Sequence, residues 1–357
     1  EIHDKGLFVN LKGYESQVFL DVYEVIDDEA GTYRRLAEFL DGSGTQSVSG
    51  ALREITFAPL YAAFRPLLYN WFPKLKGAIF GTGDPRLVSH DVEGFAAAVR
   101  EFVSQAKNFS GRAVDSEKLT ALILDRLDNA SRLCRRLQKP KTSKSSVKPV
   151  IMDGWKFLTG CEHVSAIPEI LFTYAVLQGM GDPTLLEEWA LDAEAGKFFI
   201  RDGSGLGQAD ALCLLLKILL RHDSWFDSVR KYDSPPVRAR TSLEYLFGDP
   251  DIQSFAGVNR FEEEVYFNKE GFLSLIWWLC VISLIRKPSG KDPAGDDYLR
   301  VADEIVLLGE WLEAFEKAGY RLHKLFDLID GGQKAAAAAA PKKAAEKKAR
   351  KKNPKAP

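Results

Sequence analysis

The chain has 357 residues, of which 46% are hydrophobic and 27% are charged, and its formal net charge is −2. This balance is typical of a soluble globular protein, and the length is sufficient for two ordinary domains or one large helical domain with additional segments. The most apolar stretch, Gly271–Ile285, has fifteen residues. A membrane-spanning helix needs about 20, so we expect no membrane segment, and the N-terminal residues do not resemble a signal peptide.

Charge is distributed unevenly along the chain. Residues Lys334–Pro357 hold nine Lys/Arg and one acidic residue, Glu346, a sum of +8. The preceding residues hold 39 basic and 49 acidic side chains, a sum of −10. An acidic body and a basic tail have different physical properties, so we interpret them separately.

Two strands are predicted near the N-terminus, within residues 1–26. Apolar and other side chains alternate along Leu7–Leu11 and Ser16–Val25, and the Lys12-Gly13 step between them supplies a tight turn. An isolated hairpin is marginally stable in water, and no further strand is predicted nearby. We therefore expect this hairpin to be the end of a β-domain whose remainder lies upstream of Glu1.

Helices dominate the prediction from Thr32 onward. Residues 27–138 form a first helical lobe, in which Pro66 is expected to kink its helix and the glycine- and proline-rich stretch Pro73–Pro85 to form a loop. The first helix of this lobe begins at Thr32 and ends at Gly42, and the others span Ser49–Ile55, Pro59–Trp71, His90–Lys107 and Asp115–Leu137.

A polar, lysine-rich stretch at 139–149 is interpreted as a linker to a second helical lobe, 150–330. Residues 331–357 are of low complexity and lack an apolar face, which predicts a disordered tail. The predicted fold class is an all-α, multi-helical chain of two lobes that follows a β-hairpin remnant. Helices of the second lobe are predicted at Ile167–Gly179, Pro183–Lys197, Ala209–His222, Thr241–Phe247, Lys269–Ile285 and Tyr298–Lys317, with a last turn or two at Tyr320–Ile329.

The helix at Lys269–Ile285 is the predicted centre of the fold. Asn268 is suited to cap it. The stretch from Gly271 onward is apolar on every side and includes Trp277 and Trp278. A helix without a polar face is buried on every side, so the other helices are expected to pack around it.

The four cysteines are far apart in the sequence, whereas metal sites usually pair cysteines two to four residues apart. We interpret them as reduced core residues, which favours a cytoplasmic location. They are Cys134, Cys161, Cys213 and Cys280. The pattern Cys161-Glu162-His163 has no second pair of ligands near it, so neither a metal site nor a cofactor site is predicted.

No pattern in the sequence predicts a catalytic site. Gly203–Gly207 lacks the ending of a phosphate-binding loop and is interpreted as a turn before a helix that starts near Gln208. Asp91, which follows His90, is interpreted as an acid at a helix start rather than as part of a glycosidase site. Glu262-Glu263-Glu264 is interpreted as a solvent-exposed acidic loop.

The tail is the strongest charge feature of the sequence. Its cations would attract polyanions such as nucleic acid, anionic lipid or acidic proteins, without specificity and with a strong dependence on salt. A solubilising tail is the alternative interpretation. The cations concerned are Lys342, Lys343, Lys347, Lys348, Arg350, Lys351 and Lys352.

Aromatic and histidine side chains outside the tail are interpreted as structural. Tryptophans at helical spacing are more often core residues than residues that stack on sugar rings. The tryptophans concerned are Trp71, Trp155, Trp225 and Trp311. His222 and His323 are interpreted as ordinary charges near helix C-termini.

Two stretches resemble segments of a group of very large bacterial α-amylase-family proteins. Lys5–Ile55, KGLFVNLKGYESQVFLDVYEVIDDEAGTYRRLAEFLDGSGTQSVSGALREI, resembles the segment after the catalytic barrel, where a hairpin leads into a helix and a glycine-x-glycine loop. Gly257–Leu279, GVNRFEEEVYFNKEGFLSLIWWL, resembles a segment near the C-terminus of the same group. The order and spacing of the two segments agree with that group.

This resemblance implies the C-terminal region of a glycoside hydrolase that acts on α-glucans. The family's aspartate nucleophile, glutamate acid/base and supporting aspartate lie on strand ends of a TIM-type barrel. None of the motifs that carry them occurs here, so no catalytic residue is transferred. We expect a non-catalytic accessory region, with the upstream catalytic and β-domains as its partners and α-glucan as a further ligand.

Two other classes of function remain open. The chain is alternatively a stand-alone helical interaction scaffold with a polyanion-binding tail. A helical enzyme is the third class, and it would require convergent polar residues in a pocket between the two lobes.

Overall fold

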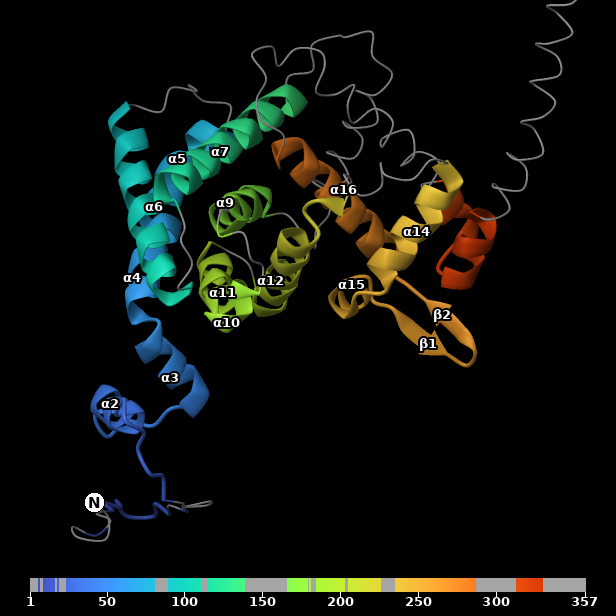
Figure 1. Cartoon of the computed structure of the whole chain (residues 1–357). Coiled ribbons are helices and arrows are strands. Elements are labelled where there is room, and N and C mark those ends of the chain that lie inside the picture. The colour runs from blue at the N-terminus through green and yellow to red at the C-terminus, as the bar shows by residue number, and fades with distance from the viewer. Residues whose placement is uncertain are drawn as a thin grey trace, which may run out of the picture. The chain divides into compact units, whose positions relative to one another are not determined.

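The computed structural model describes residues 6, 9–16, 18, 24–80, 89–110, 115–138, 166–178, 180, 184–202, 205–225, 235–286 and 313–329. These residues are mostly helical, which confirms the all-α character predicted from the sequence (Figure 1). The chain divides into two compact units, Glu1–Ala58 and Pro59–Pro357, which we call unit 1 and unit 2. The linker predicted at 139–149 and the tail lie outside the described residues.

Unit 1 contains the helices α2 (Thr32–Leu40) and α3 (Val48–Thr56), both at predicted positions. Two aspartates hold the start of α2, because Asp28 accepts a hydrogen bond from the Thr32 backbone at 2.9 Å and Asp27 accepts one from the Tyr33 backbone at 2.8 Å. Such contacts satisfy backbone N–H groups that a helix cannot pair itself.

The turn predicted between the two N-terminal strands is present. The Glu15 backbone N–H donates to the Lys12 carbonyl at 3.0 Å. Val9–Leu11 do not form a strand. Most of the second predicted strand lies outside the described residues.

Unit 2 begins with an interrupted helix, α4 (Ala58–Pro66), η1 (Leu67–Trp71) and α5 (Phe72–Phe80). Pro66 has no N–H to continue the α-helical ladder, and a π-helical turn follows it instead of a simple kink. The loop predicted from Pro73 is wrong as far as Phe80. Pro73 occupies the first turn of α5, where a missing N–H is tolerated, and Leu75 is 1% exposed, so burial favours a helix there.

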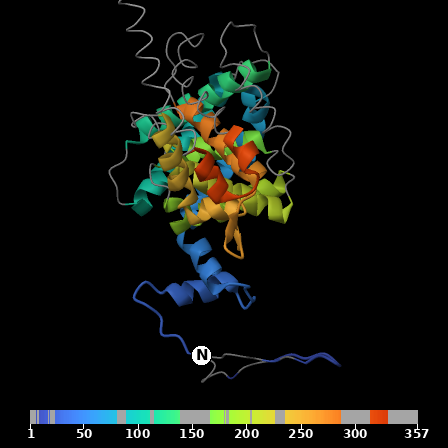
Figure 2. The same ribbon diagram turned by 90° about the vertical axis from the view of Figure 1, so that its right-hand side faces the viewer.

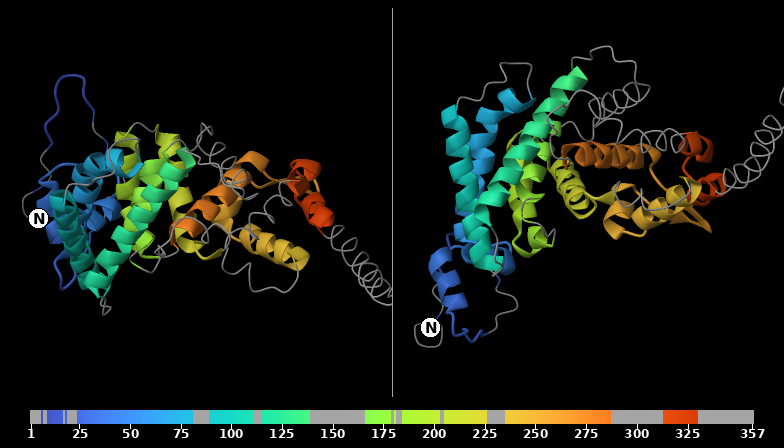
Figure 3. Two further views of the ribbon diagram at one scale, coloured as in Figure 1. Left: turned by 90° about the horizontal axis from the view of Figure 1, so that it is seen from above. Right: turned by 45° about the horizontal axis from the view of Figure 1, so that its top comes forward.

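The longest helices of unit 2 are α6 (Ser89–Ser110) and α7 (Ser116–Gln138), which lie side by side (Figure 3). The α7 helix also contacts α5, α9 (Ile167–Gln178) and α16 (Lys269–Arg286). Unit 2 therefore contains helices from both sides of the predicted linker.

A single predicted helix at Pro183–Lys197 is two helices, α10 (Leu185–Glu188) and α11 (Leu191–Arg201). Ala190 adopts a left-handed conformation with φ of 48°, which ends the helical ladder between them. Trp189, which precedes Ala190, is anchored at this break. Its side chain is 5% exposed, and its carbonyl accepts a hydrogen bond from the Tyr61 hydroxyl at 2.8 Å. Burial of Trp189 thus outweighs the local helical pattern.

The next three helices are α12 (Leu206–Arg221), α14 (Pro235–Phe247) and α15 (Pro250–Phe255). The sequence predicted α12 with a later start, only the second half of α14, and no helix at α15. Asp249 caps α15, and its side chain accepts a hydrogen bond from the Asp251 backbone at 2.8 Å. An Asp-Pro pair of this kind is a recognised helix-start signal.

The acidic stretch Glu262-Glu263-Glu264 belongs to a β-hairpin, not to a loop. Strand β1 (Asn259–Phe261) pairs antiparallel with β2 (Glu264–Tyr266), and Glu262 and Glu263 form the turn (Figures 1 and 2). The hairpin is held at its base, where the Phe267 backbone N–H donates to the Tyr320 carbonyl at 2.9 Å. Further helical segments lie at 313–318 and 322–329.

Helix α16 is buried on every side, as its composition predicts. Asn268 caps it, accepting a hydrogen bond from the Gly271 backbone at 2.8 Å. Trp278 is completely buried, and at the other end the Asn129 side chain of α7 donates to the Ile285 carbonyl at 3.1 Å. Among the helices of the described segments, none has the length and apolar character needed to cross a membrane.

Candidate functional site

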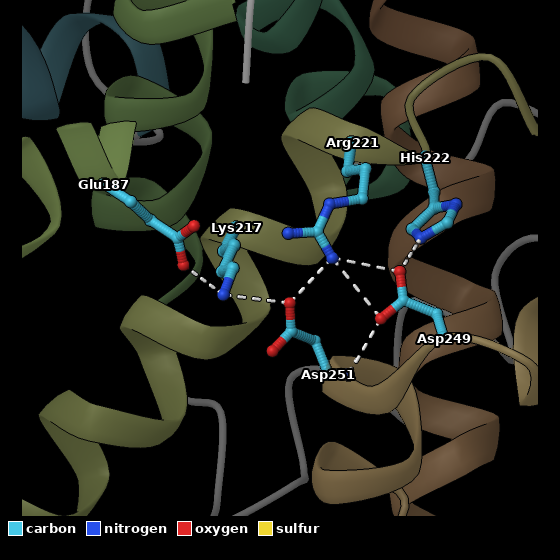
Figure 4. A network of polar contacts seen from close by, with 6 residues as sticks. All are labelled: Glu187, Lys217, Arg221, His222, Asp249 and Asp251. Carbon is cyan, nitrogen blue, oxygen red and sulfur yellow. Dashed lines mark hydrogen bonds and ion pairs between the residues drawn. The ribbon is translucent and has the colours of Figure 1, made fainter. Parts of the chain in front are cut away.

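The most connected polar cluster joins the end of α12 to the start of α15, and we call it the α12–α15 cluster (Figure 4). The last turns of α12 supply cations, and the first turn of α15 supplies carboxylates. Both groups complement the helix dipoles, since cations are favoured at a helix C-terminus and anions at an N-terminus. The cluster consists of Glu187, Lys217, Arg221, His222, Asp249 and Asp251.

Asp249 is the centre of the α12–α15 cluster. Its Oδ2 atom lies 2.7 Å from His222 Nε2 and 3.0 Å from Arg221 Nη1. Burial disfavours the ionised carboxyl, but the hydrogen bonds from His222 and Arg221 outweigh this effect and lower the pKa of Asp249 to about 2. The carboxylate is therefore ionised at neutral pH and fully engaged by its neighbours.

The outer part of the α12–α15 cluster is centred on Asp251, whose carboxylate binds two cations. Asp251 Oδ2 lies 2.7 Å from Arg221 Nη1 and 3.0 Å from Lys217 Nζ, and Lys217 also pairs with Glu187 of α10. Burial opposes ionisation of Asp251, yet the hydrogen bonds from Lys217 and Arg221 lower its pKa. The arrangement alternates positive and negative groups, so it ties three helices together.

A His-Asp pair can serve general acid–base chemistry when a nucleophile or substrate lies within hydrogen-bond reach. Here His222 is 5% exposed, and its ring lies edge-on to the Tyr245 ring at a centroid distance of 5.5 Å. In the described part of the chain no group of three or more His, Cys, Asp or Glu side chains could hold a metal ion. The ion pairs of the α12–α15 cluster connect α10, α12 and α15.

A second cluster joins α5, α9 and α11. Lys76 of α5 pairs with the buried Glu169 of α9, and its Nζ atom lies 3.0 Å from Asp202 Oδ2 at the end of α11. Burial, followed by a hydrogen bond with Asp202, raises the pKa of Glu169. The hydrogen bond from Glu169 lowers the pKa of Asp202. The pKa of Glu169 is thus raised and that of Asp202 lowered, and both carboxyl groups bind the ammonium group of Lys76.

A third cluster, beside the second, centres on the buried Glu194 of α11. Arg65 of α4 binds it through two hydrogen bonds, from Nε at 2.6 Å and from Nη2 at 3.1 Å, and Lys197 lies 2.5 Å away. Burial opposes the ionised form of Glu194, but these cations outweigh it and lower the pKa of the carboxyl. This two-point contact fixes α11 against α4.

The structure places several residues singled out in the sequence. Asp91 lies in the first turn of α6, as predicted. Trp225 is a core residue, 2% exposed, and its Nε1 donates to the Ser242 carbonyl at 3.3 Å. Trp71 is half-buried against Phe95.

The structure also describes the surroundings of two cysteines and two histidines that were interpreted from the sequence. Cys280 is buried, as predicted for a core residue, and burial raises the pKa of the Cys213 thiol to about 12. His222 is not an ordinary terminal charge, because its side chain is buried and bonded to Asp249. His323 remains half-exposed and lies 2.8 Å from Glu264. The remaining candidates lie outside the described residues: Cys161, His163, Trp155, Trp311 and the tail residues Lys342, Lys343, Lys347, Lys348, Arg350, Lys351 and Lys352.

The sequence did not reveal the three polar clusters. The contacts that join different helices connect residues 27 to 129 positions apart, so no local pattern predicts these contacts. One local signal was present: Asp249-Pro250-Asp251 predicts a capped helix start, and a histidine at the end of a preceding helix is a suitable partner for its first acid.

No family model, no curated protein and no solved structure matches the chain.

Proposed function

We propose that the chain is a non-catalytic accessory region of an α-amylase-family glycoside hydrolase that acts on α-glucans. The proposal rests on the resemblance of Lys5–Ile55 and Gly257–Leu279 to that family and on one property of unit 1. The resembling N-terminal segment coincides with unit 1, and the second segment contains the β-hairpin and most of α16.

Unit 1 exposes apolar side chains and buries few. Only Leu36 and Ala51 are buried among its described hydrophobic residues. The described residues of unit 1 therefore contribute little of the buried apolar area on which independent stability depends. Nine of the fourteen large hydrophobic side chains that are exposed in the described residues belong to this unit: Val9, Leu11, Tyr14, Val18, Val25, Ile26, Tyr33, Phe39 and Val48.

This exposed apolar surface supports a docking role, because apolar patches of this kind mark protein interfaces. We infer that its partner is the catalytic or β-domain of the same hydrolase. Phe39 is 55% exposed and Ile26 is 90% exposed, and they follow the segment that resembles the end of a β-domain. Contact with that domain would bury both side chains.

The carboxyl pair of the second cluster favours a non-catalytic role for this region. In glycosidases two carboxyl groups flank the scissile bond at about 5 Å or more. Glu169 and Asp202 both accept a hydrogen bond from the Lys76 ammonium group, which therefore occupies the space beside both. A sugar ring does not fit between groups so arranged.

Three experiments test this proposal. Purified residues 1–330 are expected to release no sugar from starch or glycogen, and release of sugar would contradict the accessory role. The DNA upstream of the codon for Glu1 is expected to continue the reading frame into a barrel-sized segment. Co-expression with that segment should yield a complex, and Ile26→Glu with Phe39→Glu should weaken it, whereas the matched exposed residue Tyr245→Glu in unit 2 should not.

The second candidate function is an interaction scaffold with a polyanion-binding tail. One observation favours it: the residues from Lys334 onward sum to +8, whereas the rest of the chain sums to −10. A start codon at or just before Glu1 would support this candidate and contradict the first. Under this candidate, exposed apolar residues of unit 1 would contact a different protein.

A further inference from the structure

Glu169 is a charged side chain in an otherwise apolar helix. Helix α9 is buried on nearly every side, and Glu169 itself is 5% exposed. A buried carboxyl group needs a partner or a proton, since burial of an unpaired charge is strongly unfavourable. Lys76 is such a partner for Glu169.

Two groups reach Glu169 from neighbouring helices. Lys76 of α5 donates to its Oε1 atom, and the same ammonium group donates to Asp202 Oδ2 at 3.0 Å. Asp202 is the residue after the last turn of α11, and its backbone N–H still bonds to the Phe198 carbonyl at 3.0 Å. The three groups therefore link α5, α9 and the end of α11.

The charges of this cluster do not balance unless a proton is added. Two ionised carboxylates and one ammonium sum to −1 beside a buried side chain. One proton on Glu169 brings the sum to zero and lets its hydroxyl donate to Asp202. Both carboxyl groups bond to the same Lys76 nitrogen atom, so they lie close enough for their negative charges to repel, and such a pair takes up a proton more readily than a lone carboxyl group.

We propose that Lys76, Glu169 and Asp202 form a proton-operated latch, which holds the end of α11 against α5 and α9 while the carboxyl pair keeps one proton. Loss of that proton places two negative charges beside one lysine. Asp202 is the member that can move, because its side chain is 33% exposed whereas that of Glu169 is 6% exposed. The end of α11 is thereby released toward solvent. This device is independent of the proposed function.

The direction of the pKa values agrees with the latch. Burial and the hydrogen bond with Asp202 raise the pKa of Glu169, and the hydrogen bond from Glu169 lowers that of Asp202. The groups that face Glu169 are Lys76 from α5 and Asp202 from α11. Arg126 of α7 and Asp223, two residues after α12, bind Gln178, about 13 Å along α9 from Glu169.

The sign of the pH effect follows from linkage. The folded chain holds a proton on Glu169 at pH values where the unfolded chain has lost it, so stability falls as pH rises through the folded pKa of Glu169. Glu169→Gln keeps the shape and the hydrogen-bond donor but has no proton to lose. We expect the mutant to lose this fall in stability, and the exposed control Glu188→Gln to keep it.

The test measures the carboxyl group and the helix end separately. The carboxyl ¹³C resonance of Glu169, assigned by its absence in Glu169→Gln, should titrate above the ordinary glutamate pKa in the folded full chain. In Asp202→Asn its midpoint should fall by about one pH unit, because the neighbouring negative charge is gone. Amide-exchange protection at residues 199–202 should fall on the same titration, relative to residues 215–219 of α12.

Two results would overturn the latch. A Glu169 resonance that titrates at or below the ordinary glutamate value shows that the pair holds no extra proton. Unchanged protection at residues 199–202 across the Glu169 titration shows that the proton does not control the end of α11. The titration and the exchange protection are both measured on the folded wild-type chain, and the protection measurement needs no variant, so it tests the latch even if Glu169→Gln does not fold.

Discussion

The Nε2 atom of His222 lies 2.7 Å from Oδ2 of Asp249, and this contact joins the residue that follows α12 to the residue that caps α15. Both side chains are almost fully buried, with 4% and 10% exposure. A similar contact between His323 and Glu264, at 2.8 Å, has side chains that are 52% and 38% exposed. The two pairs differ mainly in burial, which makes the second a control for the first.

Asp249→Ala is expected to lower the free energy of unfolding by about 3 kcal/mol. The mutation removes the cap of α15 and leaves the buried His222 without its acceptor, while Arg221 keeps only Asp251. Glu264→Ala should change the free energy by about 1 kcal/mol or less, because exposed ion pairs contribute little. Urea denaturation monitored by tryptophan fluorescence measures both. Equal losses in the two variants would contradict the structural role of the α12–α15 cluster.

The lowered pKa of Asp249 predicts how the free energy of unfolding changes at acidic pH. Its pKa is about 2 in the folded chain, against 3.8 for an ordinary aspartate, so the unfolded chain binds the proton first as pH falls. This group therefore adds about 2 kcal/mol of stability above pH 4, which is lost between about pH 4 and pH 2. The difference in unfolding free energy between wild type and Asp249→Asn should shrink over that interval. A difference that stays constant with pH would show that the pKa of Asp249 is not lowered in the folded chain.

The fold was predictable wherever a helix has one long, continuous apolar pattern. Helices α2, α3, α6, α7, α9, α12 and α16 lie at or near their predicted positions, because each has either a periodic or a continuous apolar pattern, and some have an end signal such as Asn268 or Asp115. Predictions failed where tertiary contacts outweigh local sequence. Trp189 breaks a helix by its burial, and β1 and β2 are only three residues long and need the contact with Tyr320 to form.

The polar clusters were less predictable than the helices. Each member looks like an ordinary surface charge in the sequence, because helical periodicity does not show which exposed positions meet another helix. Glu194 and Glu169 are examples, since both lie in helices yet are buried beneath Arg65 and Lys76. Their partners lie more than 90 positions away. Only Asp249, which caps a helix, belongs to a local sequence pattern that indicates its role.

Replacement of a glycine by alanine should lower the stability at one position in α6 and raise it at one position in α5. A Cβ atom at Gly94 in α6 would lie 2.5 Å from the Trp71 ring, whereas one at Gly77 in α5 would meet nothing within 4 Å. Gly94→Ala should therefore lose about 1–2 kcal/mol, since the clash exceeds the gain in helix propensity. Gly77→Ala should gain about 0.5–1 kcal/mol.

Thermal unfolding of both glycine variants checks these signs. Trp71→Leu is the matched partner, because it removes the ring that Gly94 touches. In the Trp71→Leu background, Gly94→Ala should be less harmful than in wild type, and the double-mutant cycle measures the difference. A loss that is the same in both backgrounds would mean that the close contact between Trp71 and α6 is not what limits residue 94.

The basic tail predicts a salt-dependent affinity that is lost on truncation. Residues 1–333 carry a net charge of −10 and should be repelled by a polyanion, whereas the full chain adds nine cations and one acid. Binding to a single-stranded nucleic acid should therefore require the tail. The logarithm of its association constant should fall steeply with the logarithm of salt concentration, with a slope of about −6 if every cation is engaged. Fluorescence anisotropy at several salt concentrations measures this slope.

A control separates charge from length in that experiment. The full-length chain with glutamine at the seven central tail positions, Lys342, Lys343, Lys347, Lys348, Arg350, Lys351 and Lys352, keeps the length of the tail but loses most of its charge. Its slope should fall close to that of residues 1–333, because counterion release depends on the number of cations. If residues 1–333 bind the nucleic acid as tightly as the full chain, the binding surface lies on the acidic body and the tail serves only to keep the protein soluble.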